Sequence, residues 1–453
     1  MTIPDSAYAV DHDLYADELL TECTQCAEEG LDTTLVAPIF RAAADLPRGD
    51  VRSRIADALF HWTQTAPIAD AYAYREPSSL EEIRALCEPF ELHAASFPTD
   101  ADLYEKIRGA WTGRICGCLL GKALEGIRSE ELIPFLQMTG NYPMHRYPLA
   151  ADLTDDVCGA IRFPLRGKPF ADTIPCAPAD DDTNYTVLAQ ILIERFGRDF
   201  TGADVLDCWL RLQPASAYFT AEQVAYRNRT AGLLPPFSAT YKNPFREWIG
   251  AQIRGDYFGY ICPGDPETAA ELAFRDAQIS HVKNGIYGEM FVSAMLAAAA
   301  VTRDLSQIIR SGLSQIPKTS RLHARITEVA DAYAGGVSFD ACTERIRSLY
   351  DEHTSYGWCH TIPNAMIVSA ALLYGGGDFG KSICMAVQSA FDTDCNGATV
   401  GSVLGMTNGA GAIGSEWTAP LHEKMSTEIQ NMGTVEIDSL VQKTIKHIKE
   451  VKA

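Results

Sequence analysis

The sequence predicts an all-α fold. Apolar residues recur three or four positions apart in almost every long segment, as on one face of a helix, whereas the alternating pattern of a strand is scarce. Strand and helix patterns do not alternate along the chain, which argues against a doubly wound sheet. The predicted helices are Asp13–Glu28, Val51–Trp62, Leu103–Gly121, Thr183–Phe196, Pro266–Ser280, Tyr287–Val301, Ser306–Ile316, Ser320–Ala334, Ile362–Leu373, Phe379–Ala390 and Asn396–Met406.

A break near residue 100 divides the 453-residue chain into two parts. The first helical patterns are followed by a polar stretch and by the segment Phe97–Asp100. Thr99 or Asp100 is well placed to cap the next helix, because a short polar side chain accepts hydrogen bonds from the free N–H groups of a first turn. We predict an N-terminal helical appendage over residues 1–100, with a packing or oligomerisation role, and a main domain over residues 101–453.

The net charge of −21, from 59 acidic and 38 basic side chains, narrows the classes of partner. A surface of that sign repels phosphate backbones and anionic lipids, so neither nucleic acid nor a membrane is expected as a partner. The longest apolar run, Phe291–Val301, is too short to span a bilayer. The amino terminus lacks the basic region and apolar run of a signal peptide, and the 13 cysteines follow no disulfide framework. We therefore expect a cytoplasmic protein.

Two series of glycines at every fourth position are the most unusual feature of the predicted helices. Glycine in a helix interior costs about 1 kcal/mol relative to alanine, so each series needs a compensating reason. A stripe without side chains lets another helix or a ligand approach the backbone closely. We expect both series to pack tightly around a site. They consist of Gly109, Gly113, Gly117 and Gly121, and of Gly397, Gly401, Gly405 and Gly409.

Two clusters of aspartates each stand directly before a predicted helix. Neighbouring carboxylates repel one another, and a divalent cation or the N–H groups of a helix start relieve that repulsion. Capping explains one aspartate in each cluster and leaves the others unexplained. Hard oxygen ligands suit magnesium, calcium or manganese better than zinc, so the pattern favours a site for such an ion. The clusters are Asp180-Asp181-Asp182 before Thr183, and Asp392-Thr393-Asp394 before Cys395.

Four motifs follow one another along the main domain. In order, they are the glycine helix that ends in Gly117–Glu125, the segment Asp180–Thr183, Ser280-His281 leading into Asn284–Gly288, and the segment Asp392–Asp394 with its glycine helix. This order resembles the ADP-ribosylglycohydrolases of the dinitrogenase-reductase-activating type, over about residues 104–420. The resemblance implies an orthogonal helical bundle, here with an extra N-terminal helical segment, and a catalytic domain over residues 101–453.

The resemblance also implies that the acidic clusters bind two Mg²⁺ ions, or Mn²⁺ ions in their place. The family often has a threonine before the first aspartate pair and another after the second, where this chain has Asp180 and Cys395. A thiol is a softer ligand than a hydroxyl and binds Mg²⁺ poorly. The candidate metal ligands are Asp180, Asp181, Asp182, Asp392, Asp394 and Cys395, and Asp182 is also a candidate catalytic residue.

The end of the first glycine helix is similar to a family stretch that precedes a functional glutamate. The segment Gly121–Glu125 stands where the family has Gly-Asp-Ala-x-Gly, so Lys122 replaces the aspartate and Glu125 replaces the last glycine. By this resemblance Glu125 is the candidate catalytic glutamate, with Glu130 as the alternative. The substrate-binding candidates lie in these motifs, and for His281 and Tyr287 a packing role is the alternative. They are Gly121, His281, Gly285, Tyr287 and Gly288.

The activity implied by the resemblance is hydrolysis of the N- or O-glycosidic bond that joins the anomeric carbon of an ADP-ribosyl group to a protein or a small molecule. Such cleavage passes through an oxocarbenium-like state that needs charge stabilisation and an oriented water. Two metal ions would hold the ribose hydroxyls and position the water, and Glu125 would orient the substrate or act as acid or base. Two alternatives are open: a hydrolase of another ribosyl compound such as a nucleoside, and a non-catalytic relative that binds a nucleotide.

Overall fold

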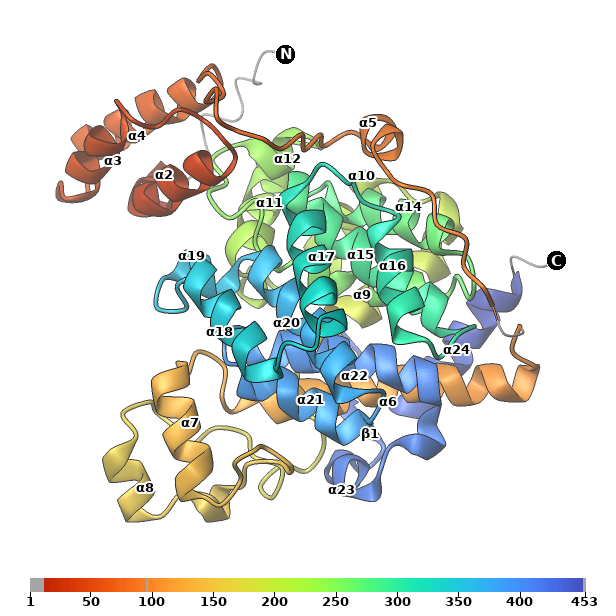
Figure 1. Cartoon of the computed structure of the whole chain (residues 1–453). Helices are drawn as coiled ribbons and strands as arrows, with labels where there is room; N and C mark the ends of the chain where they lie inside the picture. The colour runs from red at the N-terminus through yellow and green to blue at the C-terminus, as the bar shows by residue number, and fades with distance from the viewer. Residues whose placement is uncertain (1–11, 95–96, 451–453) are drawn as a thin grey trace.

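The computed structural model describes residues 12–94 and 97–450, and their regular structure is almost entirely helical (Figure 1). The prediction of an all-α fold is confirmed. Residues 1–11 lie outside the described residues. The expectation about a signal peptide concerns this segment. Within the described ranges, no helix combines the length and the apolar character needed to cross a membrane.

The N-terminal appendage packs its first helices together at one corner of the molecule (Figure 1). Its small core contains Tyr15, Phe40 and Phe60, which pack with Leu233 and Tyr241 of the main domain. The chain then runs across the main domain before its longest helix begins. The appendage helices are α1 (His12–Asp17), α2 (Leu19–Glu28), α3 (Ala37–Ala44), α4 (Asp50–Thr63) and α5 (Leu80–Ala85), so the predicted helix Asp13–Glu28 is two helices separated at Glu18.

The main domain begins with α6 (Asp100–Lys122), whose start agrees with the predicted cap. Thr99 accepts a hydrogen bond from the backbone N–H of Asp102, and the Asp102 carboxylate accepts one from the backbone N–H of Thr99. This reciprocal pair satisfies two of the N–H groups that a helix start leaves free.

The two glycine series face each other. Helix α6 runs antiparallel to α22 (Thr393–Asn408), and a Cβ added at Gly113 would overlap the carbonyl of Gly401. The same holds for Gly109 with Gly405 and for Gly117 with Gly397. The backbones of the two helices are therefore in direct contact, and this contact is the reason for the glycines.

The remaining helices surround this pair and complete the bundle (Figure 1). One antiparallel hairpin, β1 (Lys424–Ser426) with β2 (Thr434–Glu436), is the only sheet in the described residues. The remaining helices are α7 (Ser129–Met138), α8 (Asp155–Ala160), α9 (Asp181–Phe196), α10 (Gly202–Leu212), α11 (Thr220–Thr230), α12 (Phe237–Thr240), α13 (Asp256–Tyr260), α14 (Pro266–Ala277), α15 (Lys283–Ala299), α16 (Leu305–Leu313), α17 (Arg321–Ala334), α18 (Phe339–Leu349), α19 (Ser355–Cys359), α20 (Thr361–Gly375), α21 (Phe379–Gln388), α23 (Ser415–Thr418) and α24 (Ile437–Glu450).

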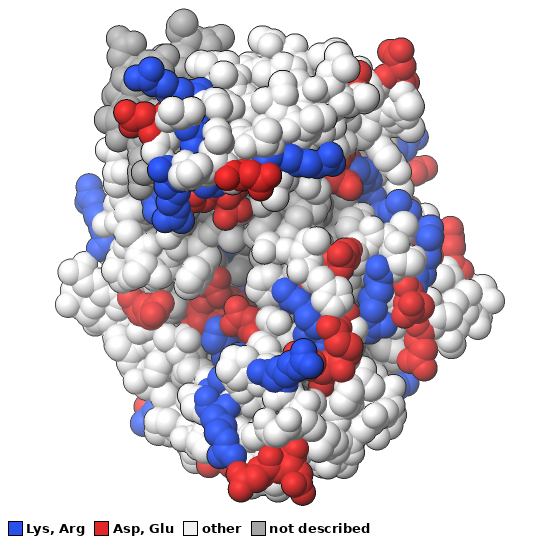
Figure 2. All heavy atoms as spheres, turned by 90° about the vertical axis from the view of Figure 1, so that its left-hand side faces the viewer, with Lys and Arg blue, Asp and Glu red and all other residues white. Residues whose placement is uncertain are grey.

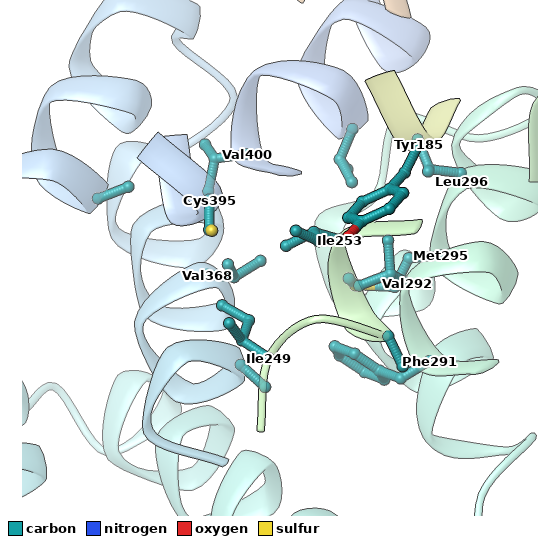
Figure 3. Packing of buried hydrophobic residues seen from close by; sticks show 14 of the residues in the cluster. Tyr185, Ile249, Ile253, Phe291, Val292, Met295, Leu296, Val368, Cys395 and Val400 are labelled. Carbon is teal, nitrogen blue, oxygen red and sulfur yellow. The ribbon is translucent and has the colours of Figure 1, made fainter. Parts of the chain in front are cut away.

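Helix α15 lies in the centre of the core, and its residues from 284 to 299 are all buried. Its apolar residues Val292 and Met295 lie near Tyr185 of α9, and Val368 of α20 lies across the core beside Cys395 of α22 (Figure 3). A helix that is apolar on every side is typical of such a central position. The core therefore extends up to the starts of α9 and α22, where the aspartate clusters stand.

Candidate metal and active site

The site forms where the end of α6 meets the start of α22. Because the two helices are antiparallel, Gly121 lies against Thr393 and Asp394, and a Cβ at Gly121 would overlap their backbone. The Thr393 hydroxyl donates a hydrogen bond of 3.0 Å to the carbonyl of Gly121. The glycine series thus fixes the second aspartate cluster directly beside Lys122, the last residue of α6.

The first aspartate cluster forms the start of α9. Asp180 is the N-cap, and its Oδ1 accepts a hydrogen bond of 2.9 Å from the backbone N–H of Asp182. Asp181 and Asp182 occupy the first turn, where the helix dipole favours negative charge. Asp180 and Asp182 are buried, whereas Asp181 is partly exposed.

The two clusters meet, although they are far apart in the sequence. Ligand atoms of Asp182, Asp394 and Cys395 lie within 4.8 Å of one another, and so do ligand atoms of Cys118, Asp180 and Asp182. Carboxylates this close repel one another strongly unless a cation separates them. We call these five aspartates the acidic site, and their roles as metal ligands stay a prediction: Asp180, Asp181, Asp182, Asp392 and Asp394.

Lys122 places a positive charge inside the acidic site. Its Nζ lies 2.5 Å from Oδ2 of Asp180, 2.9 Å from Oε2 of Glu125 and 3.5 Å from Oδ2 of Asp394. Although burial opposes ionisation of both groups, the ion pair lowers the pKa of Asp180, and the surrounding carboxylates raise the pKa of Lys122. The sequence identified Lys122 only as a replacement for an aspartate, because its ion pairs depend on how α6 and α22 pack.

Arg114, earlier on α6, holds Asp182 from within the core. The Arg114 Nε donates a hydrogen bond of 2.8 Å to the Asp182 carbonyl, and its Nη2 lies 3.2 Å from Oδ1 of the same residue. Its Nη1 lies 2.9 Å from Oδ2 of Asp256. Sequence reasoning missed this residue. A signal was available, since an arginine within a helix that is otherwise buried needs a carboxylate partner.

The backbone before the second cluster is strained. Ala390 and Phe391, both buried, have φ angles of 62° and 56° in the left-handed region, which costs about 1–3 kcal/mol for each such residue. Trp358 Nε1 donates a hydrogen bond of 2.6 Å to the carbonyl of Phe391, and the backbone N–H of Asp392 donates one of 3.2 Å to Oδ1 of Asn364. The segment before α20 and its first turn thereby hold Asp392 in place.

The other carboxyl groups of the acidic site have raised pKa values, so their ionised forms are disfavoured. Burial, and then the charges of neighbouring carboxylates, raise the pKa values of Asp181 and Asp394 well above the usual range. Burial also raises that of Asp182, although Arg114 opposes the shift. The pKa of Asp392 rises to about 6, again mainly through burial. A divalent cation would reverse these shifts, because it favours the ionised forms.

Two buried oxygens of the acidic site match a cation. Oδ2 of Asp182 and Oδ1 of Asp394 have no hydrogen-bond partner among the described residues, and the two residues are 0% and 2% exposed. An unpaired buried acceptor costs about 1–3 kcal/mol, and more when it is charged. Cys395 fits less well, because burial raises the pKa of its thiol and its sulfur points toward Val368 in the apolar core (Figure 3).

Of the two candidate glutamates, Glu125 lies beside the acidic site. Its carboxylate contacts Lys122, and its side chain is 38% exposed. Glu130 instead lies 3.5 Å from Nε2 of His353 in a different, exposed group. The structure therefore brings Glu125 together with the two aspartate clusters and places Glu130 elsewhere.

The other predicted substrate-binding residues make packing contacts. His281 is buried, with Nδ1 2.8 Å from the Ser280 hydroxyl, and burial keeps its pKa well below the usual range. Tyr287 donates a hydrogen bond to the carbonyl of Pro77. Gly285 and Gly288 both lie in α15, where Gly285 packs against His281. None of the contacts described for these residues reaches the acidic site, and their binding role stays a prediction.

Figure 2 shows the face of the molecule that lies on the left in Figure 1. A hollow crosses the middle of this face, below the N-terminal helices and above α7 and α8, and acidic side chains lie at its edge. Asp181 and Glu125 are the partly exposed carboxylates of the acidic site and its surroundings. Through them the otherwise buried site has contact with solvent.

Comparisons with known proteins identify the family. A family model described as ADP-ribosylglycohydrolase matches residues 99–450, which leaves the appendage unmatched. No curated protein matches the chain. A solved structure described as an ADP-ribosylglycohydrolase-related protein complex is similar, with a TM-score of 0.48 and 16% identity over 77% of this chain and 99% of that one. Because the family model covers most of its length, the chain belongs to the ADP-ribosylglycohydrolase family.

Proposed function

We propose that this chain is a metal-dependent glycosyl hydrolase that cleaves the N- or O-glycosidic bond at the anomeric carbon of an ADP-ribosyl group. The substrate would be an ADP-ribosylated protein or a small ADP-ribosyl compound, as family membership suggests. The observation that carries the proposal is the meeting of Asp182 and Asp394 beside Glu125. This arrangement puts unpaired carboxylate oxygens next to a carboxylate that solvent and substrate can reach.

Asp182 and Asp394 are the residues that would hold a cation, because each has a buried oxygen without a described partner. Carboxylate oxygens suit Mg²⁺, and Mn²⁺ accepts the same ligands. A bound ion would supply positive charge that orients the ribose hydroxyls and a water. Arg114 fixes one oxygen of Asp182 and leaves the other free, so the ligand is already oriented.

Glu125 would act on the reacting water. Cleavage at the anomeric carbon builds positive charge on the ribose, and carboxylates around the ring stabilise that charge. A carboxylate at hydrogen-bond distance from the attacking water also accepts its proton. Glu125 is the partly exposed carboxylate next to the cluster, and its contact with Lys122 restrains its position.

A hydrolysis assay tests this function. ADP-ribose linked through nitrogen and through oxygen would be offered beside a nucleoside, with Mg²⁺, with Mn²⁺ and with a chelator. We expect metal-dependent release of ADP-ribose, which Asp182→Asn abolishes and Glu125→Gln lowers by about 100-fold or more. Asp156→Asn is the matched control, because it belongs to an exposed aspartate pair at the start of α8.

The outcomes separate the rival activities. Hydrolysis of the nucleoside alone would replace the proposed substrate with another ribosyl compound. The position of Lys122 within the acidic site favours one further candidate, a relative that binds a ribosyl nucleotide without cleaving it. Calorimetric binding of ADP-ribose with no turnover of any substrate in any metal would establish that candidate and overturn the hydrolase.

A further inference from the structure

Lys122 stands inside a group of carboxylates that otherwise suits divalent cations. We propose that Lys122 is a resident cation of the acidic site. Its ammonium group takes the position between Asp180 and Asp394, and the site consequently binds one divalent ion per chain instead of two. The inference rests on the proposed function in one respect, namely that the remaining carboxylates bind a metal.

The ammonium group of Lys122 occupies the space that a bridging ion would need. An ion that joined Asp180 to Asp394 would have to lie about 2.0–2.6 Å from an oxygen of each. The Lys122 Nζ already lies 2.5 Å from Oδ2 of Asp180 and 3.5 Å from Oδ2 of Asp394. The ammonium group and such an ion would overlap, so the two exclude each other.

The surrounding contacts hold Lys122 in this position. Its neighbour Gly121 is locked against Thr393, because their backbones touch and the Thr393 hydroxyl bonds to the Gly121 carbonyl. Glu125 supplies a third carboxylate on the solvent side, and the Lys122 side chain is only 24% exposed. Withdrawal of the ammonium group would therefore leave three carboxylates, two of them buried, without their shared partner.

The two carboxylate oxygens of Asp394 have different surroundings. Its Oδ2 faces Lys122, and its Oδ1 has no described partner. Oδ2 of Asp182 is unpaired in the same way, and ligand atoms of these two residues lie within 4.8 Å of each other. One ion would thus be bound by Asp182 and Asp394, while Asp180 serves the ammonium group of Lys122.

Counting bound Mn²⁺ tests the inference, because Mn²⁺ can be measured by electron paramagnetic resonance and by calorimetry without any substrate. We expect one Mn²⁺ per chain in the unmodified protein. Lys122→Met keeps the length of the side chain and removes its charge, so we expect that variant to bind two. Lys168→Met is the matched control, since the Lys168 ammonium group contacts the backbone carbonyl of Glu125 and the ring of Phe163, and its loss should leave the count at one.

The number of bound ions separates the role of Lys122 from the existence of the metal centre. Two ions in the unmodified protein would overturn the role of Lys122 and leave the metal-dependent hydrolase intact, and this count does not depend on any variant being folded. A count of one in a folded Lys122→Met protein would overturn the exclusion as well. If neither protein binds Mn²⁺, the metal centre of the proposed function fails, and the inference fails with it.

Discussion

Nη2 of Arg114 lies 3.2 Å from Oδ1 of Asp182, and both side chains are fully buried. This ion pair joins α6 to the start of α9, and Asp256 binds the same guanidinium group at 2.9 Å. The pair leaves Oδ2 of Asp182 without a described partner, so it orients the carboxylate and keeps one oxygen available. Arg114 therefore contributes both to the stability of the core and to the orientation of a predicted metal ligand.

Replacing Arg114 should destabilise the protein strongly. We expect Arg114→Met to lower the free energy of unfolding by about 3–5 kcal/mol, because two buried carboxylates lose their cation. Chemical denaturation measures this change, and a Mn²⁺ titration of the folded fraction should show weaker binding. Arg108→Met is the control on the same helix, because its partner Glu423 is 61% exposed and an ion pair at the surface contributes about 1 kcal/mol or less. Equal losses in the two variants would contradict the prediction.

The glycine contact gives a second prediction. Gly113→Ala would push a methyl group into the carbonyl of Gly401, so we expect a loss of about 1–3 kcal/mol in the free energy of unfolding. Gly159→Ala is the control, because a Cβ at that helical position in α8 meets open space and should stabilise the helix slightly. Thermal unfolding of both variants measures the difference. A Gly113→Ala protein as stable as the unmodified one would show that α6 and α22 are not in backbone contact.

Most of the fold could be predicted from the sequence because its signals are local. Helical spacing of apolar residues identifies long segments such as α14, α17 and α20, and Thr99 marks the start of α6. The predicted helices omit short ones such as α8, which opens behind the Thr154 cap, and also the longer helices α10, α18 and α24. A helix of one or two turns carries too few apolar residues to show a period.

The acidic site was less accessible to prediction because it depends on contacts between distant segments. The aspartate clusters could be recognised by their local charge, and Glu125 by its motif. Arg114 and Lys122 could not be assigned partners until α6, α9 and α22 were placed together. The left-handed backbone of Phe391 could not be predicted either, because its residue type does not favour that conformation. The hydrogen bond from Trp358 and the burial of Phe391 depend on the packed fold.

The appendage should unfold together with the main domain. Arg321 of α17 binds Glu76 of the appendage at 2.9 Å and Glu247 of the main domain at 2.7 Å, with all three side chains buried. We expect Glu76→Ala to cost about 3 kcal/mol or more, because it breaks a buried network. Glu81→Ala, in the exposed part of α5, should change the stability by about 0.5 kcal/mol or less. Urea denaturation followed by fluorescence and by circular dichroism measures both. Two separate transitions would show that the appendage is an independent unit.

Metal binding should weaken as the pH falls. A ligand carboxyl must be ionised to bind a cation, and burial raises the pKa of Asp392, which the sequence predicts as a further ligand beside Asp182 and Asp394, to about 6. Affinity should therefore fall as the pH drops through about 6, and binding should release protons in that range. Calorimetric titration in two buffers with different ionisation enthalpies measures the release. The metal-free protein should respond in the opposite sense, since a pKa raised in the folded state adds stability as the pH falls. An affinity that stays constant between about pH 5 and about pH 8 would remove Asp392 from the site.

Cys395 lies at the boundary between the acidic site and the apolar core. Its sulfur lies within 4.8 Å of carboxylate oxygens of Asp182 and Asp394. The same sulfur points toward Val368 of the apolar core (Figure 3). Burial raises the pKa of the thiol, so it stays protonated and is a poor partner for a hard cation. A threonine hydroxyl at this position would be a harder neutral ligand.

We therefore expect Cys395→Thr to bind Mg²⁺ about fivefold more tightly, because one added neutral polar contact contributes about 1 kcal/mol. Mn²⁺ accepts softer ligands than Mg²⁺, so its binding should change less. Calorimetric titrations with each ion, and activity measured at low Mg²⁺, test this. Cys395→Ala is the control, because it removes the sulfur without adding a hydroxyl and should leave Mg²⁺ binding no tighter than before. Identical Mg²⁺ curves for the threonine variant and the unmodified protein would place Cys395 outside the coordination shell, as a small residue that packs the start of α22 against the core.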